Sequence, residues 1–270
     1  MGNNQIISEE HRLYLKKVRQ RKFLILSAQF FLLAAFLALW ELLGDLKLID
    51  PFITSQPSRI IRTLGNMYRE GQLFYHIWVT CYETVIGFIL CTVIGTVIAV
   101  ILWWSEFLSK VLEPYLVVLN SLPKIALGPI FIVWIGAGPS SIIVIALTIS
   151  LVVTILEVLN GFLAVDQDKI KLVRTFGANR LQVLAKVVLP SSYPVIINAL
   201  KINVGLSWVG VIVGEFLVSK AGLGYLIVYG GQVFQLDIVM TSVLILCVAA
   251  ALIYQGVVYV EKLLLKSGRY

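Results

Sequence analysis

Charged residues are scarce in this 270-residue chain: aspartate, glutamate, lysine and arginine make up 14% of it, against roughly 25% in an average soluble protein. Hydrophobic residues reach 59%, and the mean hydropathy is +0.91. A soluble globule cannot bury this much apolar surface, so lipid must cover the remainder. The composition therefore excludes an ordinary soluble enzyme, a disordered chain and a nucleic-acid-binding arm.

Residues that bind metals or form disulfides are also few. The three cysteines, Cys81, Cys91 and Cys247, lie in apolar runs without CxxC spacing, which is typical of small buried side chains. The two histidines, His11 and His76, are too few to hold a metal ion alone. The sequence therefore predicts no metal site.

Two catalytic signatures are missing as well. The chain has no Gly-Lys dipeptide, hence no Walker A phosphate loop, and it has no HExxH zinc motif. The stretch from Gly138 to Ser141 resembles a nucleophile turn only superficially, because neither histidine is expected near it. We therefore expect no catalytic residue and no cofactor on this chain, and any ATP hydrolysis must belong to a separate chain.

What the sequence does contain is long apolar runs. Six of them approach the ~20 residues with which a helix crosses ~30 Å of hydrocarbon. They cover residues 23–43, 78–104, 111–135, 141–159, 194–217 and 238–260. The third run is the least regular, because Pro123 and Pro129 interrupt it. The pattern predicts an all-α polytopic membrane protein with six transmembrane helices.

The basic residues are distributed unevenly between the connecting segments. Sixteen of the 22 lie in residues 1–22, 105–124, 160–193 and 261–270, whereas five lie in the segments on the opposite side. The positive-inside rule then places both termini in the cytoplasm. The formal net charge of +7 thus marks membrane sidedness and not a nucleic-acid partner.

The segment 44–75 is expected on the external side. Ser58, next to Pro57, is positioned to cap a short helix from about Arg59 to Arg69. Its apolar residues, among them Ile60 and Met67, fall on one helical face, which favours a helix lying on the membrane surface.

Small residues recur at helical spacing within two of the runs. Gly87, Cys91 and Gly95 are four residues apart in the second run, and Gly210 and Gly214 are four apart in the fifth. Such spacing lets a neighbouring helix approach closely. The alternative is that glycine is simply frequent in membrane helices.

The fifth run carries polar residues that are candidates for a translocation path. Asn203 and Ser207 share a helical face with Trp208 adjacent, and we predict that all three face the path. The alternative is a dry interface with interhelical hydrogen bonds. Two charges, Lys201 and Glu215, lie about 21 Å apart along the helix and therefore near opposite ends. Lys201 is expected to extend to the cytoplasmic face, and Glu215 to reach either the path or the solvated outer interface.

The segment 160–193 reads as two short helices. Asp166 can cap the first, and Gly177 stands where that helix should end. Asn179 can cap the second, with Gln182 three residues later. This cytoplasmic segment is long enough to predict a structured docking element for a partner protein. The alternative is an amphipathic pair of helices resting on lipid.

Two prolines follow the second short helix. Pro190 is expected to end it, and Pro194 to begin the fifth transmembrane helix.

The residues from Arg174 to Arg180, RTFGANR, followed by Val187-Val-Leu-Pro190, resemble the coupling loop of type I ABC importer permeases. The likeness is greatest to the branch that imports nitrate, taurine, alkanesulfonates and related solutes. It extends over about residues 56–266 and includes Leu122-Pro123, Trp134–Gly138, Glu215-Phe216 and Gly222–Ile227. One departure is that Lys171-Leu172-Val173 stands where the family often has Glu-Ala-Ala, which removes one expected contact with the ATPase.

The resemblance implies a permease subunit that carries a small solute delivered by an external binding protein. It implies a second permease copy and two ATPase subunits, which would hold ATP and Mg²⁺, in a cell (plasma or inner) membrane. It assigns ATPase coupling to residues 160–193, with these residues in contact: Arg174, Phe176, Gly177, Ala178, Arg180, Leu189 and Pro190. The rival function is a secondary transporter driven by an ion gradient, which normally has ionisable residues near mid-membrane.

On this reading the chain has five parts. They are a basic cytoplasmic N-terminus (1–22), the first transmembrane helix (23–43), the external segment (44–75), a type-1 permease core (76–260) and a cytoplasmic tail (261–270).

Overall fold

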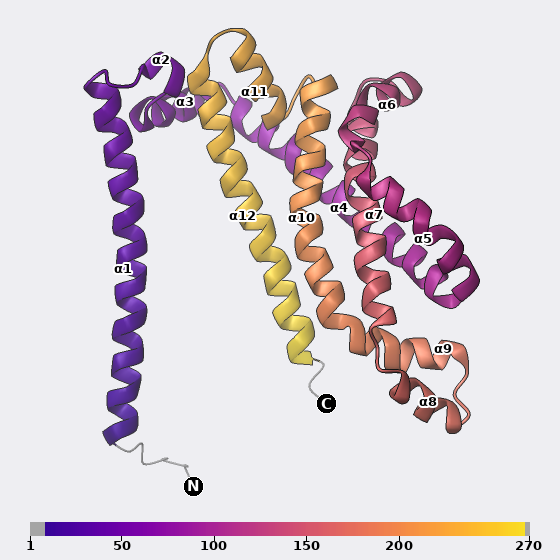
Figure 1. Cartoon of the computed structure of the whole chain (residues 1–270). Helices are drawn as coiled ribbons and strands as arrows, with labels where there is room; N and C mark the ends of the chain where they lie inside the picture. The colour runs from indigo at the N-terminus through magenta and orange to yellow at the C-terminus, as the bar shows by residue number, and fades with distance from the viewer. Residues whose placement is uncertain (1–8, 268–270) are drawn as a thin grey trace. The chain divides into compact units, whose positions relative to one another are not determined.

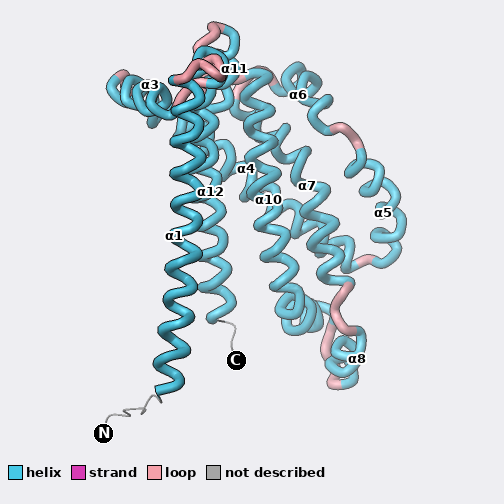
Figure 2. Tube along the Cα trace, turned by 60° about the vertical axis from the view of Figure 1, so that its left-hand side comes forward, coloured by secondary structure: helices cyan, strands magenta, loops and turns pink. Residues whose placement is uncertain are grey.

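A computed structural model describes residues 9–267, and within this range the chain forms helices and no strand (Figures 1 and 2). The helices are α1 (Glu9–Asp45), α2 (Pro51–Thr54), α3 (Pro57–Arg69), α4 (Gln72–Trp104), α5 (Glu106–Ser121), α6 (Gly128–Ile135), α7 (Pro139–Leu163), α8 (Gln167–Thr175), α9 (Arg180–Val183), α10 (Leu189–Val218), α11 (Leu223–Gln232) and α12 (Leu236–Ser267). A 3-10 turn, η1 (Lys124–Leu127), precedes α6, and a π-helical turn, η2 (Leu184–Val188), joins α9 to α10.

Five helical stretches of the described range are long and apolar enough to cross a membrane. They are Leu13–Asp45, Gln72–Trp104, Pro139–Leu163, Arg180–Val218 and Leu236–Tyr259. The α5–α6 pair, bent by 86° at the break between Ser121 and Lys124, counts as a sixth crossing if it is one broken span and as none if it is a re-entrant loop. The break falls at Pro123, as the sequence predicts, because proline cannot donate the hydrogen bond that would continue the helix.

The chain divides into two compact units at Thr63–Leu64. In the first unit, α1 exposes its whole apolar window, so lipid or another helix must cover it. In the last turns of α1, Glu41 Oε2 accepts a hydrogen bond from the Ser58 backbone N–H at 3.0 Å, and Asp45 Oδ1 accepts one from Gln56 Nε2 at 3.0 Å. The prediction that Ser58 caps the surface helix is therefore wrong, because α3 begins at Pro57 and the Ser58 N–H is bonded by Glu41.

The second unit is built around α7, which packs between α4 and α10. Four glycines singled out in the sequence all face α7: Gly87 and Gly95 from α4, and Gly210 and Gly214 from α10. A Cβ added at Gly210 would lie 2.5 Å from the Cα of Ala146, and one at Gly214 would lie 3.0 Å from the Cα of Ile142. These backbones approach so closely that only glycine fits without a shift.

The two ends of this unit differ. Helices α6 and α11 lie at one end of the bundle, and α8, α9 and the last turns of α12 lie at the other (Figure 1). The first is called the α11 end and the second the α8 end.

An apolar core at the α8 end fixes the short helices to the bundle. Ile170 and Val183 are buried in one cluster with Leu102 and Phe162. Most of the apolar residues of the two short helices thus pack against α4 and α7, whereas Phe176 and Leu181 are exposed, which favours a docking element over an amphipathic pair resting on lipid.

The two prolines of this region do not act as the sequence suggests. The chain is helical without interruption from Arg180 to Val218, and both Pro190 and Pro194 lie inside α10. Pro190 falls in the first turn of α10, directly after the π-helical turn, where a missing N–H is tolerated. The predictions that Pro190 ends a helix and that Pro194 begins the next are thus corrected.

Candidate functional site

A buried carboxylate connects α4, α10 and the start of α11 at the α11 end of the bundle. Glu215, near the end of α10, is only 1% exposed. Its Oε1 accepts a hydrogen bond from Thr80 Oγ1 of α4 at 2.6 Å, and its Oε2 accepts one from the Gly224 backbone N–H at 2.5 Å. The expectation that Glu215 reaches a solvated outer interface is therefore wrong.

Side chains satisfy three consecutive backbone N–H groups at the start of α11. The Gly222 N–H donates to His76 Nδ1 at 3.0 Å, and the Leu223 N–H donates to Thr80 Oγ1 at 2.7 Å, while Gly224 donates to Glu215. These are among the N–H groups that a helix leaves without an internal partner. The segment before α11 is thus fastened to both α4 and α10.

Glu83 is the second buried carboxyl group of this cluster. It is 1% exposed and lies close to Glu215. Oxygen Oε2 of Glu83 has no hydrogen-bond partner among the described residues. Glu83 is not among the site residues predicted from the sequence, although a charged residue within a long apolar run is the signal that identifies it.

The predicted pathway residues lie in the interior of the bundle. Asn203 and Ser207 are almost fully buried and Trp208 is 7% exposed, so in this conformation they do not face an open cavity. Their side-chain polar atoms, the indole Nε1–H included, have no hydrogen-bond partner in the described range. The alternative of interhelical hydrogen bonds is therefore not realised within this chain. Such groups require water, a solute or a partner subunit.

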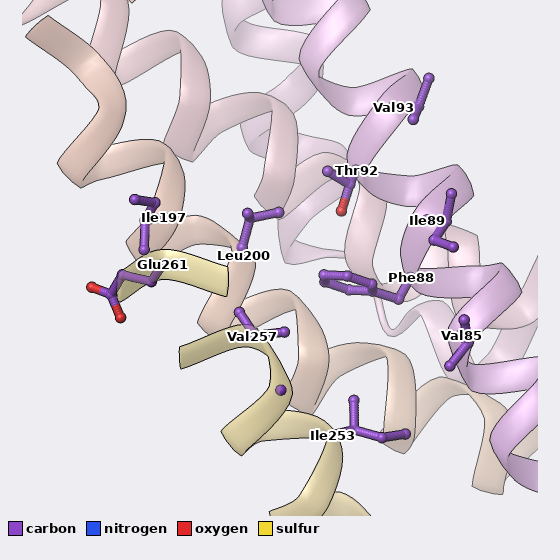
Figure 3. A pocket seen from close by; sticks show the side chains of 11 residues that line it. Val85, Phe88, Ile89, Thr92, Val93, Ile197, Leu200, Ile253, Val257 and Glu261 are labelled. Carbon is purple, nitrogen blue, oxygen red and sulfur yellow. The ribbon is translucent and has the colours of Figure 1, made fainter. Parts of the chain in front are cut away.

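An apolar groove of about 370 Å³ lies between α4, α10 and α12 (Figure 3). Its walls are aliphatic and aromatic, with Phe88 and Val257 as examples, and Glu261 is the charged residue among those that line it. Glu261 pairs with Lys201 at 2.8 Å, so Lys201 contacts α12 and does not simply extend to the surface as predicted. This groove suits acyl chains and does not suit a polar solute.

The loop at the α8 end is ordered by its own caps. Asp166 accepts a hydrogen bond from the Asp168 N–H at 2.9 Å. Asn179 and Gln182 form a reciprocal capping box, with bonds of 2.9 and 2.8 Å. Gly177 separates α8 from α9 with a φ of +83°, a region that favours glycine. The predicted caps and break are confirmed.

The predicted coupling residues divide into two sets. Arg174, Phe176, Gly177, Arg180 and Pro190 are exposed, and Phe176 is 81% exposed at the tip. Ala178 and Leu189 instead pack on the apolar core at this end. A large exposed aromatic beside an ordered turn is a typical anchor for a protein partner.

Arg180 has a contact that the sequence analysis did not foresee. Its guanidinium carbon lies 5.4 Å from the ring centroid of Trp104 and 6.0 Å from that of Trp103, at the end of α4. Such cation–π contacts link a loop to a helix end. Arg180 therefore faces back toward α4, and the loop is joined to α4 as well as to α10.

Comparisons with known proteins agree with this geometry. The aliphatic sulfonates permease SsuC of Bacillus subtilis, so named putatively, is 30% identical over 86% of this chain and 84% of its own. The taurine transport permease TauC of Escherichia coli is 24% identical over 83% of each chain. The formylaminopyrimidine permease ThiX of Halalkalibacterium halodurans is 27% identical over 70% of this chain and 75% of its own.

The fold also matches a solved structure. A chain of the MetNI methionine ABC transporter in an inward-facing conformation superposes with a TM-score of 0.62 at 21% identity, covering 69% of this chain and 93% of that one. The bundle with its inserted α8–α9 loop is thus the type I ABC importer permease fold. The model of the binding-protein-dependent transport system inner membrane component matches residues 91–264, and the chain belongs to that family.

Proposed function

We propose that this ABC importer permease works as one of two permease copies, with two ATPase subunits at the α8 end and a solute-binding protein at the α11 end. The observation that carries the proposal is the α8–α9 loop. It is capped at both helices, exposes Phe176 at its tip and continues without a break into α10. A displacement of the loop by a partner therefore moves a transmembrane helix.

The mechanism supported by this arrangement is alternating access. Closure of an ATPase pair would draw the two loops together and rotate the helices attached to them, opening the path at the other end. A ligand shifts such a two-state element only by its differential affinity for the two states. The binding protein would favour the outward-open state and ATP hydrolysis would restore the inward-open one.

The basic residues support the sidedness of this arrangement. The α8–α9 loop and the last turns of α12 lie at the same end of the bundle (Figure 1). The segments predicted to be cytoplasmic carry sixteen of the 22 basic residues. By the positive-inside rule the α8 end faces the cytoplasm, where ATP is available.

The solute is a small anion of the sulfonate type or a related vitamin precursor. The support is that relatives are named for aliphatic sulfonates, taurine and formylaminopyrimidine. Affinity would reside mainly in the binding protein, whose bound solute on co-purification identifies the substrate.

A secondary transporter driven by protons is the second candidate. The observation that favours it is the contact between Glu83 and Glu215 inside the bundle, since buried carboxyl groups serve as proton relays in such transporters. Here, however, both Glu215 oxygens receive hydrogen bonds that fasten α11.

One experiment separates the two functions. The chain is reconstituted into proteoliposomes with its co-purified ATPase and binding protein, and uptake of the identified solute is measured with ATP and a protonophore present. We expect uptake to require ATP and to persist with the protonophore. Uptake that needs a proton gradient and ignores ATP would contradict the importer.

A further inference from the structure

A cavity of about 350 Å³ opens at the α11 end of the second unit, separate from the apolar groove. It is bounded by the first half of α4, the start of α7 and the segment that follows α10. Its volume falls at the low end of the ~300–1,000 Å³ typical of small-molecule pockets. The residues that line it are Tyr75, Val79, Glu83, Ala137, Gly138, Pro139, Ile142, Val218, Ser219, Lys220 and Ala221.

One wall of the cavity carries a hydrogen-bond acceptor that nothing in the described chain satisfies. Glu83 lines the cavity, and its Oε2 has no hydrogen-bond partner although the side chain is 99% buried. The neighbouring Glu215 cannot compensate, because its own oxygens are bound by Thr80 and Gly224. This wall therefore lacks a hydrogen-bond donor, a role that an ammonium group can fill.

A second wall of the same cavity carries the opposite charge. Lys220, just beyond the end of α10, lines the cavity and forms no ion pair with an acidic residue of the described range. Residues that line the cavity thus include a lysine and a carboxyl acceptor, which come from different elements.

We propose that this cavity binds a zwitterionic small solute, with its ammonium group at Glu83 and its anionic group at Lys220. A solute with an anionic group alone would leave the buried Glu83 acceptor without a donor, and a simple amine would leave Lys220 without a partner. A site with a buried group that hydrogen-bonds the ligand binds analogues without the matching polar group much more weakly. Among sulfonates, an aminoalkanesulfonate therefore fits and an unsubstituted alkanesulfonate does not.

This inference rests on the proposed function, because it specifies the chemical class of the solute that the permease transports. It adds a selective step in the permease itself, after release from the binding protein. Only a solute that spans both charges would be held at the α11 end while the bundle changes conformation.

The test measures direct binding to the permease–ATPase complex in nanodiscs, without the binding protein. The probes are radiolabelled taurine, ethanesulfonate, which lacks only the amine, and ethylamine, which lacks the sulfonate. We expect taurine to bind at least about tenfold more tightly than either analogue. Equal binding of taurine and ethanesulfonate would overturn the proposal.

Two variants assign the binding to the cavity. Glu83→Gln keeps the side-chain volume and should weaken taurine binding by about tenfold to a hundredfold, with little change for ethanesulfonate. The matched control is Glu70→Gln, which removes an exposed acid just before α4 and should leave taurine binding unchanged. Taurine binding that is unaltered by Glu83→Gln would contradict the assignment.

Lys220→Gln provides an independent arm, because Glu83 contacts Glu215 and its replacement can disturb folding. Lys220 is exposed, so its variant should assemble at normal abundance. It should weaken taurine binding about tenfold and leave ethylamine unaffected. ATP-dependent uptake through the binding protein is measured in parallel. If that uptake is intact but these binding differences are absent, only this inference fails. If uptake does not depend on ATP, the proposed function fails.

Discussion

Glu215 differs from most acidic residues in apolar helices, because both of its oxygens accept hydrogen bonds from other segments of the chain. One partner, Thr80, is 135 residues away in the sequence. Removing such an acceptor leaves buried donors unsatisfied, which costs about 1–3 kcal/mol per group. The energetic role of Glu215 in this conformation is therefore to hold α11 against α4 and α10.

The glycines that flank this carboxylate follow from the same contact. A Cβ added at Gly222 would overlap the Glu215 carboxylate, and one at Gly224 would lie 2.7 Å from Glu215 Oε2. Gly222 also has a φ of +109°, which L-residues rarely adopt. Both positions therefore require glycine for a local reason.

We predict that Gly222→Ala destabilises the protein by about 1–3 kcal/mol, because it combines backbone strain with overpacking. The midpoint of thermal unfolding of the purified complex measures this effect. The control is Gly231→Ala in the last turn of α11, where an added Cβ meets no atom within 4 Å. Equal midpoints for the two variants would contradict the role given to the contact between Gly222 and Glu215.

At the scale of elements, the sequence predicts a feature correctly where the residues that cause it lie close together in the chain. Asp166, Gly177 and Asn179 each act on backbone groups within a few residues, so their caps and the break between α8 and α9 could be predicted. The 86° bend after α5 was equally visible at Pro123.

The elements that the sequence did not reveal depend on contacts distant in the chain. Helix α11 is held by His76, Thr80 and Glu215, and nothing in its own ten residues indicates those partners. The continuity of α10 through Pro190 depends on a π-helical turn, for which no simple residue pattern exists. The Glu83–Glu215 contact joins two helices whose charges looked unrelated.

The break between α8 and α9 gives the first prediction at this scale. Gly177→Val adds about 1–2 kcal/mol of strain at a φ of +83°, although the site has open space around it. The variant should reach the membrane at normal abundance but retain several-fold less ATPase on co-purification. Gly177→Asn is the matched control, because asparagine tolerates positive φ and should restore most of the association. Wild-type assembly and coupling in the valine variant would remove this turn from the mechanism.

The cation–π contact of Arg180 gives the second prediction at the scale of elements. Arg180→Gln and Trp104→Leu should each lower the amount of solute transported per ATP hydrolysed, because each weakens one of the contacts that join the loop to α4. Such contacts are worth about 0.5–2 kcal/mol. The double variant should be no worse than either single one, since both remove the same interaction.

Two further variants sharpen this measurement. Arg180→Lys keeps the charge and should retain part of the coupling. Lys186→Gln removes an exposed cation from the same stretch of chain and should have no effect on coupling. Additive losses in the double variant would show that Arg180 and Trp104 act separately.

At the scale of the whole molecule, the number of crossings decides on which side each end lies. If the bent α5–α6 pair is one span, it and the five long helical stretches of the described range make six crossings, and the topology predicted from the sequence then has both termini on one side of the membrane. The α8–α9 loop lies at the same end of the second unit as the last turns of α12 (Figure 1). From the distribution of basic residues we predict that this side is the cytoplasm.

Cysteine labelling tests this topology in intact cells. In a background with Cys81, Cys91 and Cys247 replaced by alanine, we expect Asn66→Cys on α3 to react with a membrane-impermeant maleimide added from outside. Lys171→Cys on α8 should react only after the membrane is permeabilised. Both positions are exposed, so a difference in their reactivity reports sidedness and not burial. The reverse pattern would place the loop outside the cell, where no ATPase could use it, and would overturn both the orientation and the coupling role of α8 and α9.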